Sequence, residues 1–358
     1  MKRTFSRPIK RIVVKLGSSQ IADSTMHPKT AQLSALAEQI KELHRRNIDV
    51  VLVSSGAIVL GMGELGEKKR PLQLTALQAR AAIGQTVLMH TYRELFKKVD
   101  LKCAQVLLTW DDFDDRVRHE NASHTLETIL KQGVIPVVNE NDTVSTEEIK
   151  FGDNDKLSAL VASSIDADLL IILSDVEGFY DQNKQVRGEI KQLTPEIMTM
   201  ATGTSNVQVA RGGMITKLDA IEIVSHAKIP CVITAGNTHN VLVRLVDGEK
   251  LGTLFHEKEK KIAAHKHWIR FVATSKGNLH ADEGARKALL EGKSLLLPGV
   301  KHFDGHFKKG DVVCVKDAQG KILAKGIVNY SVTDLLKIDD KKGKEEVIHR
   351  DHLILIQG

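Results

Sequence analysis

The sequence predicts an α/β protein with an open, mostly parallel sheet between helices, followed by a small β-rich module. Within the first 60 residues, a short aliphatic strand, a small polar turn and an amphipathic helix follow one another twice. This alternation is typical of parallel sheets, whose ligands gather beyond the carboxyl ends of the strands. From Phe271 onward the chain changes to short strands and frequent glycines, which is typical of a compact β module.

The expected elements follow from local patterns taken in order. Residues 9–16 and 49–53 are branched aliphatic runs that end in small polar turns, and both are expected strands. Apolar residues recur at helical spacing between residues 28 and 46, which predicts a helix. The same criteria predict helices over 74–97, 121–131, 156–164 and 216–227, and strands over 103–109, 134–138, 168–173 and 231–235.

Two domains are expected from the length of 358 residues and from the change in texture. We place the larger domain at residues 1–260, a linker at 261–271 and the smaller domain at 272–358. The net charge is +6, and the residues from Arg270 onward hold 16 Lys and Arg against 12 Asp and Glu, a difference of +4. This excess suits a surface that binds phosphate or nucleic acid, and it equally suits a solvated face.

Composition and motifs exclude several classes of protein. No apolar run approaches the roughly 20 residues that span a bilayer, and the first residues lack an apolar leader, so we expect a cytoplasmic protein without a membrane partner. The three scattered cysteines and the lack of paired Cys or His ligands predict no disulfide and no metal-binding side chains. The G-x-G-x-x-G pattern at 61–66 lies too far beyond its strand for dinucleotide binding, and Gly292-Lys293-Ser294 lacks the first Walker A glycine.

The stretch 134–159 is the main candidate for a functional site. An aliphatic strand ends in Asn139-Glu140-Asn141-Asp142, and Gly152-Asp153-Asn154-Asp155 begins ten residues after Asp142. Amides and carboxylates beside apolar strands are costly unless something satisfies them, so a polar ligand, a metal-bound phosphate or a pair of lysines is expected there. The alternative interpretation is a solvated loop rich in Asn and Asp.

Phosphoryl transfer without a Walker loop would need glycine turns and lysines, because the transferred group and its partners are anionic. Lys15 ends the first expected strand beside Gly17-Ser18-Ser19, and Lys217 begins an expected helix after Gly212-Gly213. Either residue could instead be an ordinary solvated lysine. The turn at Ser55-Gly56-Ala57 would bring the N-terminus of a helix to an anion.

Together these motifs resemble the glutamate 5-kinase family of the amino-acid kinase superfamily, and the resemblance covers nearly the whole chain. The lysine-glycine and Ser-Gly-Ala elements are shared across the superfamily, whereas the Asn-Glu-Asn-Asp and Gly-Asp-Asn-Asp pair points to glutamate 5-kinases. Residues 272–358 resemble a PUA module, notably in the motif at 305–313. The resemblance implies an amino-acid-kinase domain followed by a PUA domain.

The resemblance implies ATP-dependent phosphorylation of the side-chain carboxylate of L-glutamate with Mg²⁺, giving γ-glutamyl 5-phosphate, the first step of proline biosynthesis. A carboxylate is already a nucleophile at neutral pH, so no general base is required. The implied roles are catalysis by Lys15, Lys217 and Asp155; glutamate binding by Ser55, Gly56, Ala57, Asn139, Asp142 and Asn154; and nucleotide binding by Lys15, Ser174, Asp175, Arg211, Gly212, Gly213, Met214, Ile215, Thr216 and Lys217.

Kinship further implies inhibition by proline and assembly into a homo-oligomer, a dimer or a tetramer. Two alternatives stay open: a sister kinase acting on carbamate, aspartate or acetylglutamate, and an RNA-binding protein acting through the PUA module, which offers Phe303, Phe307 and Tyr330 for stacking. The chain departs from the family pattern in two places. Ala210-Arg211 stand where the family has Gly-Thr, and 338–347 lacks the usual Gly-Ser pattern.

Overall fold

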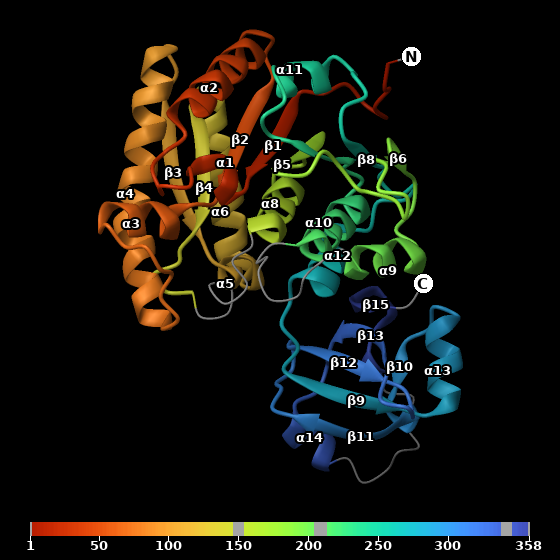
Figure 1. Ribbon diagram of the computed structural model, residues 1–358. Helices are drawn as coiled ribbons and strands as arrows, with labels where there is room; N and C mark the ends of the chain where they lie inside the picture. The colour runs from red at the N-terminus through yellow and green to blue at the C-terminus, as the bar shows by residue number, and fades with distance from the viewer. Residues whose placement is uncertain (1, 146–153, 204–212, 338–345, 357–358) are drawn as a thin grey trace. The chain divides into compact units, whose positions relative to one another are not determined.

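The computed structural model describes residues 2–145, 154–203, 213–337 and 346–356 (Figure 1). The chain separates into two compact units, Met1–Lys261 and Ile262–Gly358, which we describe one at a time. Among the described residues, no helix is long and apolar enough to cross a membrane.

Within the described residues, the first unit is built on an eight-stranded sheet with the order β3-β4-β2-β1-β5-β7-β8-β6. Neighbouring strands run parallel except for β7 and β8, which are antiparallel. The predicted open, mostly parallel sheet is therefore confirmed. The strands are β1 (Arg11–Leu16), β2 (Asp49–Ser54), β3 (Cys103–Leu108), β4 (Ile135–Glu140), β5 (Leu169–Ser174), β6 (Glu189–Ile190), β7 (Cys231–Ala235) and β8 (Thr253–Phe255).

Helices connect these strands and cover both faces of the sheet (Figure 1). The central strands are buried almost along their whole length, as expected for a parallel sheet between two helical layers. The helices are α1 (Ser18–Ile21), α2 (Thr30–Arg45), α3 (Ala57–Glu64), α4 (Leu74–Lys98), α5 (Trp110–Asp114), α6 (Arg116–Lys131), α8 (Asn154–Ser164), α9 (Pro195–Gly203), α10 (Met214–His226) and α11 (Val241–Val246).

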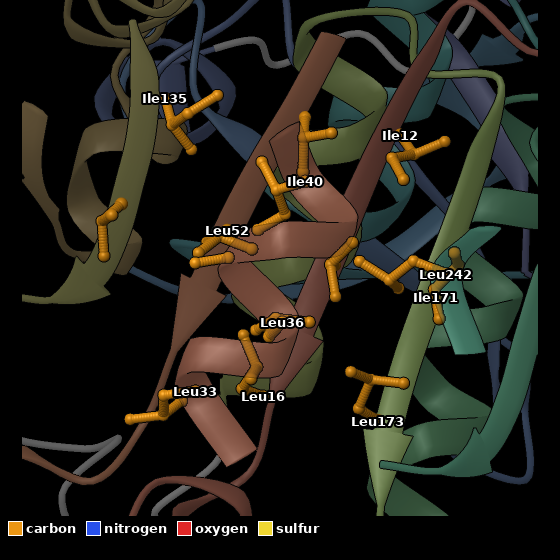
Figure 2. Close-up of a cluster of buried hydrophobic side chains, with 14 of the residues drawn as sticks. Ile12, Leu16, Leu33, Leu36, Ile40, Leu52, Ile135, Ile171, Leu173 and Leu242 are labelled. Carbon is orange, nitrogen blue, oxygen red and sulfur yellow. The ribbon is translucent and has the colours of Figure 1, made fainter. Parts of the chain in front are cut away.

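A large apolar core lies between the sheet and helices α2 and α11. Figure 2 shows its side chains, which include Ile12 and Leu16 of β1, Leu36 and Ile40 of α2 and Leu242 of α11. Successive side chains of a strand point to opposite faces. Lys15 therefore faces the other side of the sheet, where helix α8 packs against β1 and against α10.

Two helices begin earlier than their patterns predict. Helix α8 begins at Asn154 and not at residue 156, so Asn154 and Asp155 lie in its first turn, where a carboxylate is favoured by the positive end of the helix dipole. Helix α6 begins at Arg116 and not at residue 121, because the Asp115 side chain accepts a hydrogen bond from the backbone N–H of Arg118 at 2.9 Å.

The second unit holds, among its described residues, a five-stranded sheet β11-β9-β12-β13-β15 and a two-stranded sheet β10-β14. It has its own apolar core, which confirms the predicted small β-rich module. Its elements are α12 (Ala264–Phe271), β9 (Gly277–Ala281), α13 (Glu283–Leu290), β10 (Leu295–Leu296), η1 (Leu297–Gly299), β11 (Val300–Gly305), β12 (Val312–Lys316), β13 (Ile322–Ile327), α14 (Val332–Lys337), β14 (Glu346–Ile348), η2 (Arg350–His352) and β15 (Leu353–Leu355).

The segment 261–271, expected as a linker, contains helix α12. Its residue Ile269 is fully buried and packs with Ala273 and Val312 of the second unit. Helix α12 also contacts strands β13 and β15. This segment is thus packed onto the β-rich module.

Candidate active site

Lys15, Asp155 and Lys217 come together beneath the carboxyl ends of the central strands. Asp155 Oδ1 lies 2.5 Å from Nζ of Lys15, and Asp155 Oδ2 lies 3.2 Å from Nζ of Lys217. Asp155 is fully buried, and the two lysines are 5% and 6% exposed. Burying these charges is tolerable because the carboxylate forms ion pairs with both ammonium groups and accepts a hydrogen bond from that of Lys217. Two cations and one anion leave a formal charge of +1, which suits an anionic ligand.

Each member of this trio comes from a different element. The alternation of β1 directs Lys15 toward helix α8, whose first turn carries Asp155. Lys217 lies in the first turn of α10, which packs against α8. The hydroxyl of Thr216, one residue earlier, lies 3.1 Å from Asp155 Oδ2 and 2.8 Å from the carbonyl oxygen of Gly213. Three neighbouring side chains therefore fix the orientation of the carboxylate.

The two arms of the polar stretch meet through their amides. Asn154 Nδ2 donates to Asn139 Oδ1 at 2.8 Å and to the carbonyl oxygen of Ser54 at 2.9 Å. Asn139 Oδ1 also accepts from the backbone N–H of Glu140 at 2.9 Å. The end of β2, the end of β4 and the start of α8 are held together at this point. Asn139 and Asn154 are both buried, at 2% and 7% exposure.

The turn from Ser55 to Ala57 connects β2 to helix α3. The backbone N–H of Ser55 donates to the carbonyl oxygen of Leu16 at 3.0 Å. Gly56 has φ +102°, a left-handed conformation that L residues rarely adopt, and a Cβ there would lie 2.9 Å from Cγ2 of Ile21. Ala57 begins α3, so the first backbone N–H groups of that helix are presented at the turn.

Apart from Lys15 on β1, the described residues expected to bind nucleotide lie at the end of β5 and the start of α10. The Ser174 hydroxyl donates to Asp175 Oδ1 at 3.0 Å, and the Ser174 carbonyl oxygen accepts from Gln20 Nε2 at 2.9 Å. Asp175 is exposed. Gly213 is the N-cap of α10, followed by the half-buried Met214 and by Ile215, which is 38% exposed. The start of α10 reaches Asp155 directly, through Thr216 and Lys217.

Comparison with known proteins gives matches to two family models. Residues 10–235 match the Amino acid kinase family, and residues 277–350 match the PUA domain. The chain belongs to the amino acid kinase family. A curated relative from Dictyoglomus turgidum, named glutamate 5-kinase, is 43% identical over 364 residues, which cover 97% of this chain and 97% of the relative. The predicted family and enzyme class are confirmed, and this chain is a kinase.

A second curated relative of this amino acid kinase has the same name and a similar identity. A curated glutamate 5-kinase from Carboxydothermus hydrogenoformans is 41% identical over 377 residues, covering 99% of this chain and 100% of the relative. A solved structure titled "Structure of Giardia Carbamate Kinase" is 18% identical and covers 70% of this chain and 100% of that chain, with a TM-score of 0.49.

The structure describes only some of the remaining residues that the sequence predicted for the site. Asp142 is half-buried in the turn that follows β4. Outside the described residues lie the predicted nucleotide-binding residues Arg211 and Gly212, the departure at Ala210, the start of the second polar cluster at Gly152 and Asp153, and most of segment 338–347.

Helix α4 contributes site contacts that the sequence analysis missed. Asn139 Nδ2 donates to Gln85 Oε1 at 2.8 Å, and the Tyr92 hydroxyl lies 3.0 Å from Ser54 Oγ. About two turns earlier along α4, Gln78 Nε2 donates to the carbonyl oxygen of Ser145 at 3.3 Å. Gln78, Gln85 and Tyr92 are seven residues apart, and seven residues make about two helical turns. Polar side chains at that spacing were the available signal.

Two buried titratable groups of the kinase domain stay neutral. Burial raises the pKa of the Tyr92 phenol, and the hydrogen bond with Ser54 offsets this only partly. Burial likewise raises the pKa of the Cys231 thiol well above its ordinary value, and the negative charge of Asp155 adds to the shift. Cys231 is therefore a protonated, inert thiol, and Tyr92 acts as a neutral hydroxyl.

Proposed function

We propose that this kinase transfers the γ-phosphoryl group of ATP to the side-chain carboxylate of L-glutamate, giving γ-glutamyl 5-phosphate in the first step of proline biosynthesis. The observation that carries the proposal is the buried Lys15–Asp155–Lys217 trio beside the paired amides of Asn139 and Asn154. Its specificity for glutamate is supported by relatives that are named glutamate 5-kinase and that match this chain over nearly their whole length. Because ATP is held inside the cell, the reaction is placed in the cytoplasm.

The chemistry requires charge neutralisation more than acid–base catalysis. A glutamate carboxylate oxygen attacks the γ-phosphorus, the bond from that phosphorus to the bridging oxygen breaks, and ADP leaves without any proton transfer. Both partners are anionic, so the ammonium groups of Lys15 and Lys217 would stabilise the charge on the travelling phosphoryl group. Asp155 would keep both lysines in place, since its two oxygens each contact one of them.

Glutamate would lie between the amides and the turn after β2. Asn154 Nδ2 already donates to two acceptors, so its Oδ1 is the atom suited to accept from the substrate ammonium. Asp142 would provide the opposing charge for that ammonium. Ser55, Gly56 and Ala57 would donate to a substrate carboxylate through a hydroxyl and backbone N–H groups.

ATP would lie against the start of α10 and the end of β5, in contact with Lys15, Ser174, Asp175 and the run from Arg211 to Lys217. The proposal includes Mg²⁺ that is carried by the nucleotide, where it would neutralise the β- and γ-phosphates. Such a Mg²⁺ takes one or two carboxylates from a protein, and the exposed Asp175 at the end of β5 is of that kind.

The substrate is tested by measuring ADP release with ATP and Mg²⁺ against a panel of acceptors. We expect turnover with L-glutamate and at least about 100-fold lower kcat/KM with aspartate, acetylglutamate or carbamate, because buried amides left without their partners penalise the wrong acceptor strongly. Turnover with a different acceptor and none with glutamate would reject the assignment.

Proline inhibition and a dimeric or tetrameric assembly also belong to the proposal, and kinship with glutamate 5-kinases is their support. We expect added proline to lower the rate of the glutamate reaction, and sedimentation to give a mass of at least twice that of the 39.5 kDa chain. An unchanged rate at high proline would reject the inhibition by proline. A monomer at assay concentration would reject the oligomeric assembly.

Replacing Asp142 by Asn is expected to weaken glutamate binding selectively. The change removes a charge-assisted hydrogen bond to the substrate ammonium, worth about 1.5–3 kcal/mol, so KM for glutamate should rise about 10- to 100-fold. The values of kcat and KM for ATP should stay within about threefold. Glu38→Gln, which makes the same charge change at an exposed position of α2, should leave all three constants unchanged. Equal losses in kcat and in glutamate affinity would contradict this role.

A further inference from the structure

A chain of side-chain amides crosses the site, and its hydrogen bonds can run in only one direction. The Ser54 carbonyl oxygen can only accept, so Asn154 donates to it through Nδ2. The backbone N–H of Glu140 can only donate, so the Asn139 atom that faces it is the acceptor Oδ1. Asn139 must then present its Nδ2 group to Gln85, and Gln85 must accept through Oε1.

The last donor of this amide chain has no hydrogen-bond partner among the described residues. Because Gln85 Oε1 accepts from Asn139, the other end of the Gln85 amide is the donor group Nε2. This atom is buried, and within the described part of the chain it has no hydrogen-bond partner. A buried donor without a partner is rare in native proteins and marks a place that a ligand or water completes.

The position of Gln85 relative to the lysines indicates which ligand atom it meets. The lysines contact Asp155, and the amides lead away from Asp155 through Asn154 and Asn139 to Gln85. An amino acid substrate whose reacting carboxylate lies at the lysines therefore extends toward Gln85 with its other polar end. An N–H donor there can bind a carboxylate and cannot bind an ammonium group.

We propose that Gln85 is a substrate-binding residue whose Nε2 group donates a hydrogen bond to the α-carboxylate of bound glutamate. This inference rests on the proposed function and adds a specificity element to it. Helix α4 holds the residue in register, because Tyr92 and Gln78, two turns on either side, contact the last residue of β2 and the loop that follows β4. Gln85 thereby links the recognition of the substrate to the amides that position Asn139.

Gln85→Glu separates substrate binding from the positioning of Asn139. The variant keeps an oxygen that accepts from Asn139 Nδ2, and it replaces the free donor by a carboxylate oxygen. At pH 8 we expect KM for glutamate to rise at least about 30-fold, while kcat and KM for ATP stay within about threefold. Gln182→Glu, the same change at an exposed turn, should leave every constant at its wild-type value.

A pH series supplies a second readout. Protonation of the introduced carboxyl group restores a donor, so the ratio of variant to wild-type KM for glutamate should fall as the pH is lowered from 8 toward 5. The inference is overturned if Gln85→Glu keeps the wild-type KM across this range while Gln85→Met, which lacks both polar atoms, raises it. That result would make Gln85 a positioning residue for Asn139 alone. A wild-type protein that does not phosphorylate glutamate would instead reject the proposed function.

Discussion

Replacing Asp155 by Asn should lower kcat at least about 1,000-fold while KM for glutamate changes less than about threefold. Asn has the same shape but keeps only one acceptor, and its NH₂ group would face the ammonium group of Lys15 or Lys217. Both lysines contact Asp155 in the structure, at 2.5 and 3.2 Å. Without the carboxylate they would repel one another and leave their positions. Steady-state kinetics over full ranges of glutamate and ATP would measure this.

The Asp155 prediction needs a control for folding, because removing one partner of a buried ion pair costs roughly 3–5 kcal/mol. Asp168 offers a matched carboxylate at the opposite end of the same strands. It is 9% exposed, accepts from the backbone N–H groups of Lys10 and Arg11 at 2.7 Å each, and pairs with Arg7 at 2.7 Å. Asp168→Asn should lose stability in urea denaturation and keep kcat. A proportional loss of kcat and folded fraction in both variants would make Asp155 merely structural.

Local patterns in the sequence predicted most of the kinase domain because its sheet is parallel and buried. Short aliphatic runs such as 49–53 are typical of buried parallel strands. The polar residues that follow such runs gather at the carboxyl ends of the strands. That reasoning placed Lys15 and Asn139 at one edge of the sheet, and the resemblance to glutamate 5-kinases added Asp155; the structure has Asp155 in contact with Lys15. Lys15 and Lys217 contact the same carboxylate although 202 positions separate them in the sequence.

Contacts between residues far apart in the sequence could not be predicted from local patterns. The importance of Gln85 and Tyr92 depends on which face of α4 meets the ends of β2 and β4, and no local pattern states which strand a helix will face. The early start of α8 was missed for a related reason. Asn154 and Asp155 have weak helix propensity, and their place in the first turn depends on partners elsewhere in the fold.

For the glycines at 61–66, the sequence excluded a function, but only the structure explains why glycine is needed there. Their spacing in the sequence argued against a dinucleotide fingerprint, and the structure places Gly61 and Gly63 within α3. A Cβ on Gly61 would lie 1.9 Å from the carbonyl oxygen of Arg80 in α4. The glycine thus allows two helices to meet backbone to backbone, which only the folded chain reveals.

Gly84→Ala should be among the most destabilising single substitutions in this protein. A Cβ on Gly84 would lie 1.8 Å from the carbonyl oxygen of Ala57 and 2.4 Å from the backbone nitrogen of Gly61. Neither atom can move without shifting α3, so we expect a loss of about 3 kcal/mol or more. For a unit of this size that corresponds to a fall in Tm of roughly 6–12 °C. Gly188→Ala, where the added Cβ meets open space, should shift Tm by less than about 2 °C.

Gly84→Ala should also weaken glutamate binding, because the atoms that it displaces lie next to residues expected to bind glutamate. Ala57 ends the turn expected to bind glutamate, and Gln85 is the next residue along α4 after Gly84. In the folded fraction of Gly84→Ala, KM for glutamate should rise at least about tenfold, whereas KM for ATP should change little, since the residues expected to bind nucleotide lie on β1, at the end of β5 and on α10, away from α3 and α4. Equal increases in both constants would show that α3 and α4 support the whole domain and do not specifically position the glutamate site.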